Sequence, residues 1–136
     1  MRNRTVVFAG LLAGIGLAVT PLVAHHAFTA QYDADQPVEF TGIVAKVEWM
    51  NPHAYFYVNV EDEATGELIY WAAEMGSPTS LMRRGWNRNS MKIGDVVTVE
   101  GSRAKDGSAL MNARSIVLSN SGRRLFAGSS ETQGEN

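Results

Sequence analysis

Residues 77–85, with the sequence SPTSLMRRG, carry the only good helix signal between residues 25 and 128. Ser77 can cap the helix, Pro78 suits its first position, and Gly85 ends it after about two turns. The stretches on both sides show instead the alternating apolar pattern that is typical of β-strands. The place of this helix among the strands therefore decides the fold class.

Three strand patterns precede the helix. Pro37 opens the first, and a change of apolar phase after Gly42 predicts a β-bulge at that glycine. Asn51-Pro52 then forces a turn or loop. The second and third strands are predicted at residues 54–61 and 68–75, separated by a hairpin loop. The sequence thus predicts three strands before the helix.

Two long strand patterns and a short one follow the helix. Gly94-Asp95 is predicted to form a turn that precedes a strand at about 96–101, and Asp106-Gly107 is a strong hairpin signal. The next strand is expected at about 109–118, and a short terminal one at 123–126. Three strands, a helix and two strands is the element order of an OB-fold. We predict an all-β fold, an OB-like five- to six-stranded antiparallel barrel with one short helix after strand three; an open roll is the alternative.

The first 24 residues are predicted to be a secretory signal peptide. Arg2 and Arg4 give a positive start, an uncharged apolar run follows, and Ala24 suits signal peptidase. An uncleaved membrane anchor is the alternative, because the apolar run is just long enough to span a bilayer. We expect a periplasmic or secreted protein with no stable membrane insertion after cleavage. Residues 25–36 form a lead-in anchored by Phe28 and Tyr32, residues 37–127 the domain, and residues 128–136 a disordered tail.

Composition excludes several classes of function. The chain has no cysteine, so disulfides, cysteine-ligated zinc, iron–sulfur centres and thiol catalysis are ruled out. Without Arg2 and Arg4 the mature chain is acidic, which makes nucleic acid a poor partner. The sequence contains no nucleophile elbow, phosphate loop or metalloprotease signature. Glu48 and Glu74 are expected to be exposed or paired with arginines, so we expect no enzyme.

Several segments together resemble a known bacterial family. They are His25-His26-Ala27-Phe28, residues 49–53, Gly76-Ser77-Pro78, Arg83-Arg84-Gly85-Trp86, residues 94–101 and residues 103–108. The combination is similar to domain-of-unknown-function family 6152, which consists of small exported proteins. Ala27 departs from the serine expected in many relatives. The resemblance implies export and an OB-like fold, and it implies no established activity.

All three histidines, His25, His26 and His53, are candidate metal ligands. If cleavage follows Ala24, the amine and imidazole of His25 form a bidentate chelate. An amine with two or three imidazoles suits tetragonal Cu(II) better than tetrahedral zinc, in an arrangement that resembles a histidine brace. The alternative is that the histidine pair is a solvated end and that His53 orients its own loop.

The leading expectation from sequence is a non-enzymatic, OB-like periplasmic binding module. Its ligand, an unknown small molecule or a periplasmic protein, would engage the loop after strand one, which often binds ligands in OB barrels. The candidate ligand-binding residues are Asn51, His53, Tyr55, Tyr57 and Trp86. Core or cross-strand packing is the alternative role of these aromatic residues. A copper-binding protein and a structural envelope protein without a small ligand are the alternative functions.

Overall fold

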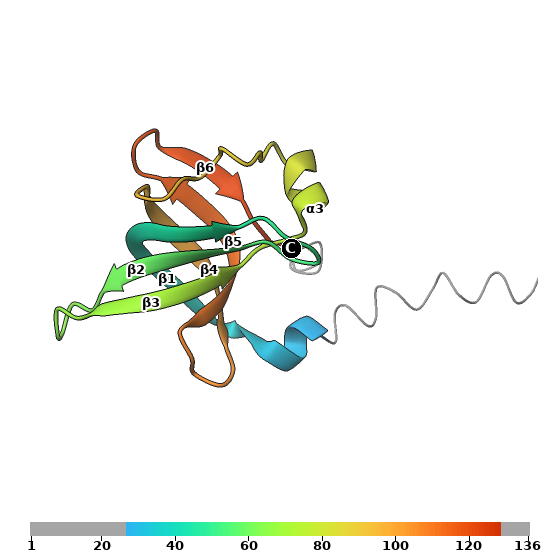
Figure 1. Ribbon diagram of the computed structural model, residues 1–136. Coiled ribbons are helices and arrows are strands. Elements are labelled where there is room, and N and C mark those ends of the chain that lie inside the picture. Colours follow the sequence, from blue (N-terminus) through green and yellow to red (C-terminus); the bar gives the residue numbers. More distant parts are fainter. Residues whose placement is uncertain (1–26, 129–136) are drawn as a thin grey trace, which may run out of the picture.

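Six strands and two short helices make up residues 27–128, the part of the chain that the computed structural model describes (Figure 1). A helical segment at residues 27–31 leads directly into the first strand. The further elements are β1 (Tyr32–Glu48), β2 (Tyr55–Glu61), β3 (Leu68–Glu74), α3 (Pro78–Arg83), β4 (Val96–Ala104), β5 (Leu110–Leu118) and β6 (Arg123–Phe126). The prediction of a mostly antiparallel all-β fold with a small helix is confirmed.

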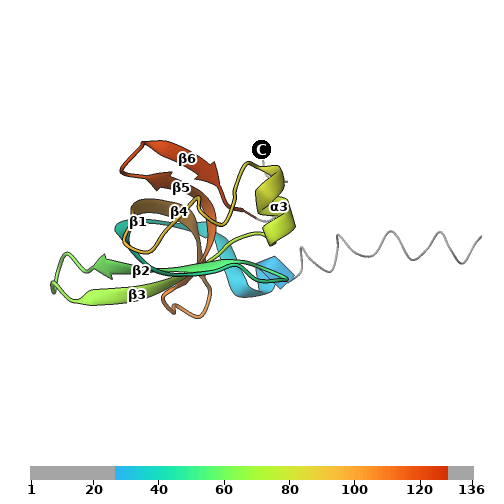
Figure 2. The ribbon, with the colours of Figure 1, turned by 45° about the horizontal axis from the view of Figure 1, so that its top comes forward.

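The strands form one sheet in the order β3-β2-β1-β4-β5-β6, in which all neighbours are antiparallel. In addition, β3 pairs with β5 in parallel, through Ala72–Glu74 and Leu110–Asn112. The loop between β2 and β3 projects from one end of the molecule, and α3 lies at the opposite end beside β6 (Figures 1 and 2). The β3–β5 pairing brings the end of β3 next to the start of β5, where the candidate site lies.

The helix α3 follows the capping pattern that predicted it. The Ser77 hydroxyl accepts a hydrogen bond from the Ser80 N–H at 3.2 Å, and Pro78 opens the helix. Gly85 ends the segment with a φ of +90°, which glycine adopts without strain. Leu81 is fully buried and fixes the helix against the core.

The predicted bulge at Gly42 is wrong, because the register between β1 and β2 shifts between Val44 and Lys46 instead. The alternation of burial continues through Val44, which leaves Ile43 51% exposed. Gly42 has a different role. A Cβ at this position would lie 2.4 Å from the backbone oxygen of Asn59, so glycine permits the close approach of β1 to β2.

The first strand also begins earlier than predicted, at Tyr32 instead of Pro37. Tyr32 and Asp33 pair with Ala104 and Arg103 of β4, and the register shifts before Pro37. The polar residues between them show no apolar alternation, so their strand conformation depends on the partner strand. Tyr32 is only 2% exposed, which confirms it as an anchor.

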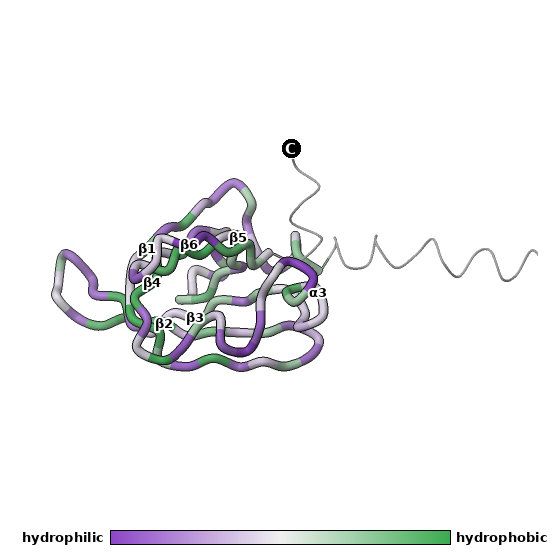
Figure 3. The backbone as a smooth tube through the Cα atoms, turned by 90° about the horizontal axis from the view of Figure 1, so that it is seen from above, coloured by the Kyte–Doolittle hydropathy of each residue, from purple (hydrophilic) through white to green (hydrophobic). Residues whose placement is uncertain are grey.

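The core lies between the strands and beneath α3. Hydrophobic and hydrophilic residues alternate along the strands (Figure 3), so each strand contributes one apolar face. The largest fully buried side chains are Phe56, Met75, Leu81, Met111, Ile116, Val44, Val58, Val97 and Val99.

The predicted signal peptide, His25 and His26, and residues 129–136 of the predicted tail lie outside the described residues. Across residues 27–128, no helix combines the length and apolar character needed to cross a bilayer.

Candidate ligand pocket

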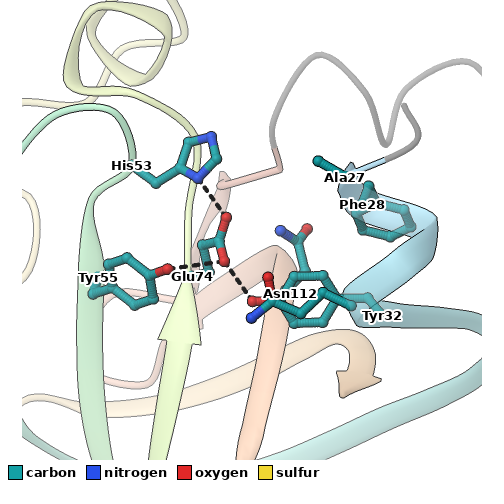
Figure 4. Close-up of a pocket in the computed structure, with 8 residues that line it drawn as sticks. Ala27, Phe28, Tyr32, His53, Tyr55, Glu74 and Asn112 are labelled. Atoms are coloured by element: carbon teal, nitrogen blue, oxygen red, sulfur yellow. Dashed lines mark hydrogen bonds and ion pairs between the residues drawn. The ribbon is translucent and has the colours of Figure 1, made fainter. Parts of the chain in front are cut away.

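A cavity of about 130 Å³ lies between the helical segment at residues 27–31, the start of β2, the end of β3 and the start of β5 (Figure 4). The residues that line it are Ala27, Phe28, Gln31, Tyr32, His53, Tyr55, Glu74 and Asn112. Parts of the sequence that are far apart therefore meet at one small site with both polar and apolar walls.

The carboxylate of Glu74 is the centre of the polar contacts in this pocket. Glu74 is only 5% exposed, and its Oε1 lies 2.5 Å from Nδ1 of His53. Its Oε2 accepts hydrogen bonds from the hydroxyl groups of Tyr55, at 2.9 Å, and Tyr32. Figure 4 shows the three side chains converging on the carboxylate. Both oxygens of this buried group are thus held by donors from separate parts of the chain.

Strand pairing explains how these side chains come together. The antiparallel register of β2 and β3 places Tyr55 opposite Glu74. The pairing continues beyond β2, since the Ala54 N–H donates to Gly76 at 3.1 Å and the Met75 N–H donates to Ala54 at 2.8 Å. This holds His53, the preceding residue, beside Glu74. The parallel pairing of β5 with β3 places Asn112 opposite Glu74.

The surroundings of Glu74 raise the pKa values of both tyrosines. Burial is the main cause of the raised pKa of the Tyr32 hydroxyl, followed by its hydrogen bond to Glu74 and the negative charge of that carboxylate. For Tyr55 the pKa is raised by burial, then by the charge of Glu74 and by the hydrogen bond to it. Both phenols therefore remain protonated at neutral pH and keep donating to Glu74.

Alkaline pH is expected to destabilise the protein through these two tyrosines. The folded-state pKa values of both tyrosines lie above the unfolded value of about 10. Their contribution to the free energy of unfolding is therefore fully present below about pH 10 and falls as the pH rises further. Each tyrosine can lower the free energy of unfolding by up to about 1.4 kcal/mol per pH unit in this range. Urea unfolding at a series of alkaline pH values measures this slope. Tyr32→Phe should make it shallower, and an unchanged slope would contradict the assignment.

Asn112 carries a buried acceptor that the described residues leave unused. The residue is 3% exposed, and its Oδ1 accepts no hydrogen bond from residues 27–128. A buried carbonyl without a donor costs about 1–3 kcal/mol. A donor group of a bound ligand would therefore be stabilised at this wall of the pocket.

Two of the five predicted ligand-binding residues, His53 and Tyr55, line the pocket. Asn51 is exposed in the loop between β1 and β2, outside the pocket lining. His25 and His26, the other candidate metal ligands, lie outside the described residues. They directly precede Ala27, which is part of the lining.

The structure does not bring Tyr57 and Trp86 to this pocket. The Tyr57 hydroxyl donates to Glu48 at 2.8 Å, and its ring stacks on Tyr70 with centroids 5.3 Å apart. Trp86 is 4% exposed and belongs to the core, where its Nε1–H donates to the backbone oxygen of Phe126 at 2.9 Å. Both residues have structural partners in the sheet and the core.

Glu74 was not expected at the site. The sequence predicts that Glu48 and Glu74 are exposed or paired with arginines, and this is wrong for Glu74, whereas Glu48 is partly exposed. Glu74 is buried against His53 and two tyrosines, while Glu48 forms an ion pair with Lys46 and accepts from Tyr57. The available signal was the predicted β2–β3 hairpin, because it places an outward-facing tyrosine opposite this glutamate.

Among residues 27–128, no group of three or more His, Cys, Asp or Glu side chains is arranged to hold a metal ion. His53 and Glu74 supply only two such groups. A metal at this pocket would therefore need donors from beyond this range.

Comparison with known proteins identifies one family. No curated protein matches the chain. A family model described as "Family of unknown function (DUF6152)" matches residues 14–112. This range covers most of the chain and contains every residue that lines the pocket. The chain therefore belongs to the DUF6152 family.

Proposed function

We propose that this protein is an exported, non-enzymatic binding module that holds Cu(II) at the pocket around His53 and Glu74. The apolar leader at residues 1–24 supports export to the periplasm or beyond. The observation that carries the copper assignment is that Ala27, the residue directly after His25-His26, lines the same cavity as His53.

The histidine pair directly precedes the pocket lining in the sequence, because His25 and His26 are followed by Ala27. Cleavage after Ala24 would add the free amine of His25. Nitrogen donors from this end and from His53 would form a site of the type that suits tetragonal Cu(II).

An OB-like barrel is the architecture we propose for the module. Strands β3, β2, β1, β4 and β5 are successive antiparallel neighbours, and the parallel β3–β5 pairing joins the two ends of this run. The five strands thus pair in a ring, to which β6 adds outside. The position of α3 directly after β3 agrees with the element order of OB-folds.

Copper binding is expected to need both a free amine at His25 and the side chain of His53. Intact mass of the secreted protein establishes whether the mature chain begins at His25. The mature protein is then titrated with Cu(II) in competition with a chelator of known affinity. One extra residue before His25, and separately His53→Ala, should each weaken binding by about tenfold or more, because each removes a nitrogen donor.

Asn51→Ala is the matched control, since Asn51 is exposed in the same loop as His53 but lies outside the pocket lining. Its copper affinity should equal that of the unchanged protein. Equal affinity of the free and extended N-termini would rule out an amine ligand. Unchanged affinity of His53→Ala would remove the pocket from the copper site.

A small organic ligand with hydrogen-bond donors is the second candidate occupant. The buried Oδ1 of Asn112 favours it, together with the negative charge of Glu74 on the same cavity. Methylammonium is a suitable probe. It should raise the Tm of the mature protein in the presence of a metal chelator, relative to sodium chloride at equal ionic strength. No difference between the two salts would exclude this candidate class.

A further inference from the structure

We infer that the pocket lined by Glu74 and Asn112 binds a short primary alkylammonium ion, with its N–H groups on Asn112 and its carbon chain against Phe28. This inference rests on the proposal that a small donor-bearing molecule occupies the cavity, and it names the chemical class of that molecule. It does not depend on copper, and every residue it uses lies between positions 27 and 128.

The polar groups at the centre of the pocket can still accept hydrogen bonds. The hydroxyl hydrogens of Tyr32 and Tyr55 are directed at Oε2 of Glu74, and each phenol oxygen can accept a further bond. A carboxylate only accepts. The buried Oδ1 of Asn112 has no donor within the described residues. A ligand that donates several hydrogen bonds therefore complements this wall.

The charge of the pocket favours an ammonium group as the donor. The Glu74 carboxylate is buried, and its negative charge contributes to the raised pKa values of both tyrosines. None of the eight lining residues is a lysine or an arginine, and the basic side chain among them, His53, already faces the carboxylate through Nδ1. An alkylammonium group carries three N–H donors and no acceptor, which matches the free acceptors of the cavity.

The volume and the apolar wall limit the carbon chain. The cavity measures about 130 Å³, and a cavity of about 150 Å³ holds benzene, so roughly five non-hydrogen atoms fit. Figure 4 shows Ala27 and Phe28 on the opposite side of Glu74 from His53 and Tyr55. The Phe28 ring also packs on that of Tyr32, with centroids 5.5 Å apart. Butylammonium, a straight chain with one terminal amine, meets these limits.

A ligand series tests this class on the secreted mature protein, with a metal chelator present and binding followed by NMR titration. The Kd should fall from methylammonium to butylammonium by about fourfold for each buried methylene. Hexylammonium should bring no comparable further gain, because the cavity is already filled. Tetramethylammonium has the charge and size of butylammonium but no N–H group, so it should not bind in the pocket. Tighter binding of butanoate than of butylammonium would overturn the proposal, since the free groups would then be donors.

Three variants test the orientation of the ligand. Asn112→Leu should weaken butylammonium binding by about tenfold or more, because the acceptor of its N–H group is removed. Phe28→Ala should abolish most of the gain from methylammonium to butylammonium. Asn59→Leu is the matched control, since Asn59 lies on β2 opposite Tyr70 and outside the pocket lining, and it should bind butylammonium unchanged. If circular dichroism shows that Asn112→Leu does not fold, Phe28→Ala decides the outcome.

The results separate this inference from the proposed function. If no alkylammonium ion binds, the small donor-bearing occupant is refuted together with this inference, and the copper titration stands as a separate result. If methylammonium binds but chain length, Phe28→Ala and Asn112→Leu leave the affinity unchanged, only the class and orientation of the ligand are refuted.

Discussion

Gly101→Ala is expected to lower the free energy of unfolding by about 3 kcal/mol, near the upper end of the range for overpacked interiors. A Cβ at Gly101 would lie 2.0 Å from the backbone oxygen of Asn112 and 2.6 Å from Cε of Met111. The methionine side chain can move aside. The Asn112 oxygen belongs to β5, whose backbone at this residue pairs with both β4 and β3. Relief of the clash therefore requires strands to separate.

Gly66→Ala is the control for this prediction. Gly66 has a φ of +73°, and no atom lies within 4 Å of the position of its Cβ. Alanine there should cost about 1–2 kcal/mol from backbone strain alone. Urea denaturation of both variants gives the comparison. If Gly101→Ala is no more destabilising than Gly66→Ala, then β5 shifts to accommodate the methyl group without losing its strand pairing, which contradicts the prediction.

Local sequence signals predicted the elements whose partners are close in the chain. The hairpin of β2 and β3 follows from apolar alternation around a turn. The caps of α3 are set by Ser77, Pro78 and Gly85, which act within the helix itself. In both cases the residues that determine the conformation are near neighbours in sequence, so a reading of short windows contains the necessary information.

Features that depend on distant strands were predicted less well. A glycine at a phase change is typical of a β-bulge, but it is also what two closely packed strands require. Gly42 has the second role because Asn59 approaches it from β2. The start of β1 was misplaced for a similar reason, since the polar residues after Tyr32 are paired by β4. Neither partner can be identified from the local pattern.

At the candidate site, too, features set by near neighbours in sequence were predicted and features set by distant segments were not. His53 and Tyr55 were predicted because a histidine after proline and an outward tyrosine are visible in sequence. Glu74 occupies the outward phase of β3, where alternation predicts exposure. It is buried because Tyr32 and the helical segment at residues 27–31 cover this end of the strand. The position of that covering segment depends on the fold as a whole.

Glu74→Leu is expected to destabilise the protein by about 3 kcal/mol, because hydrogen bonds to a carboxylate contribute about 1.5–3 kcal/mol and this residue accepts several of them. The substitution leaves the buried hydroxyl group of Tyr32, the part-buried hydroxyl group of Tyr55 and Nδ1 of His53 without their acceptor. A buried donor without a partner costs about 1–3 kcal/mol. Urea denaturation of the metal-free protein measures the loss separately from any effect on copper.

A double variant separates the lost hydrogen bonds from the altered packing. In Glu74→Leu combined with Tyr32→Phe, the buried Tyr32 hydroxyl that would lack an acceptor is also removed. The double variant should therefore lose less free energy of unfolding than the sum of the losses in the two single variants. Glu48→Leu, which affects a similar tyrosine contact at the surface, should have a much smaller effect than Glu74→Leu because water replaces the lost partner. Strict additivity in the double variant would mean that Tyr32 and Glu74 contribute independently. The carboxylate would then be an ordinary buried side chain and not the group that joins β1, β2 and β3 at the pocket.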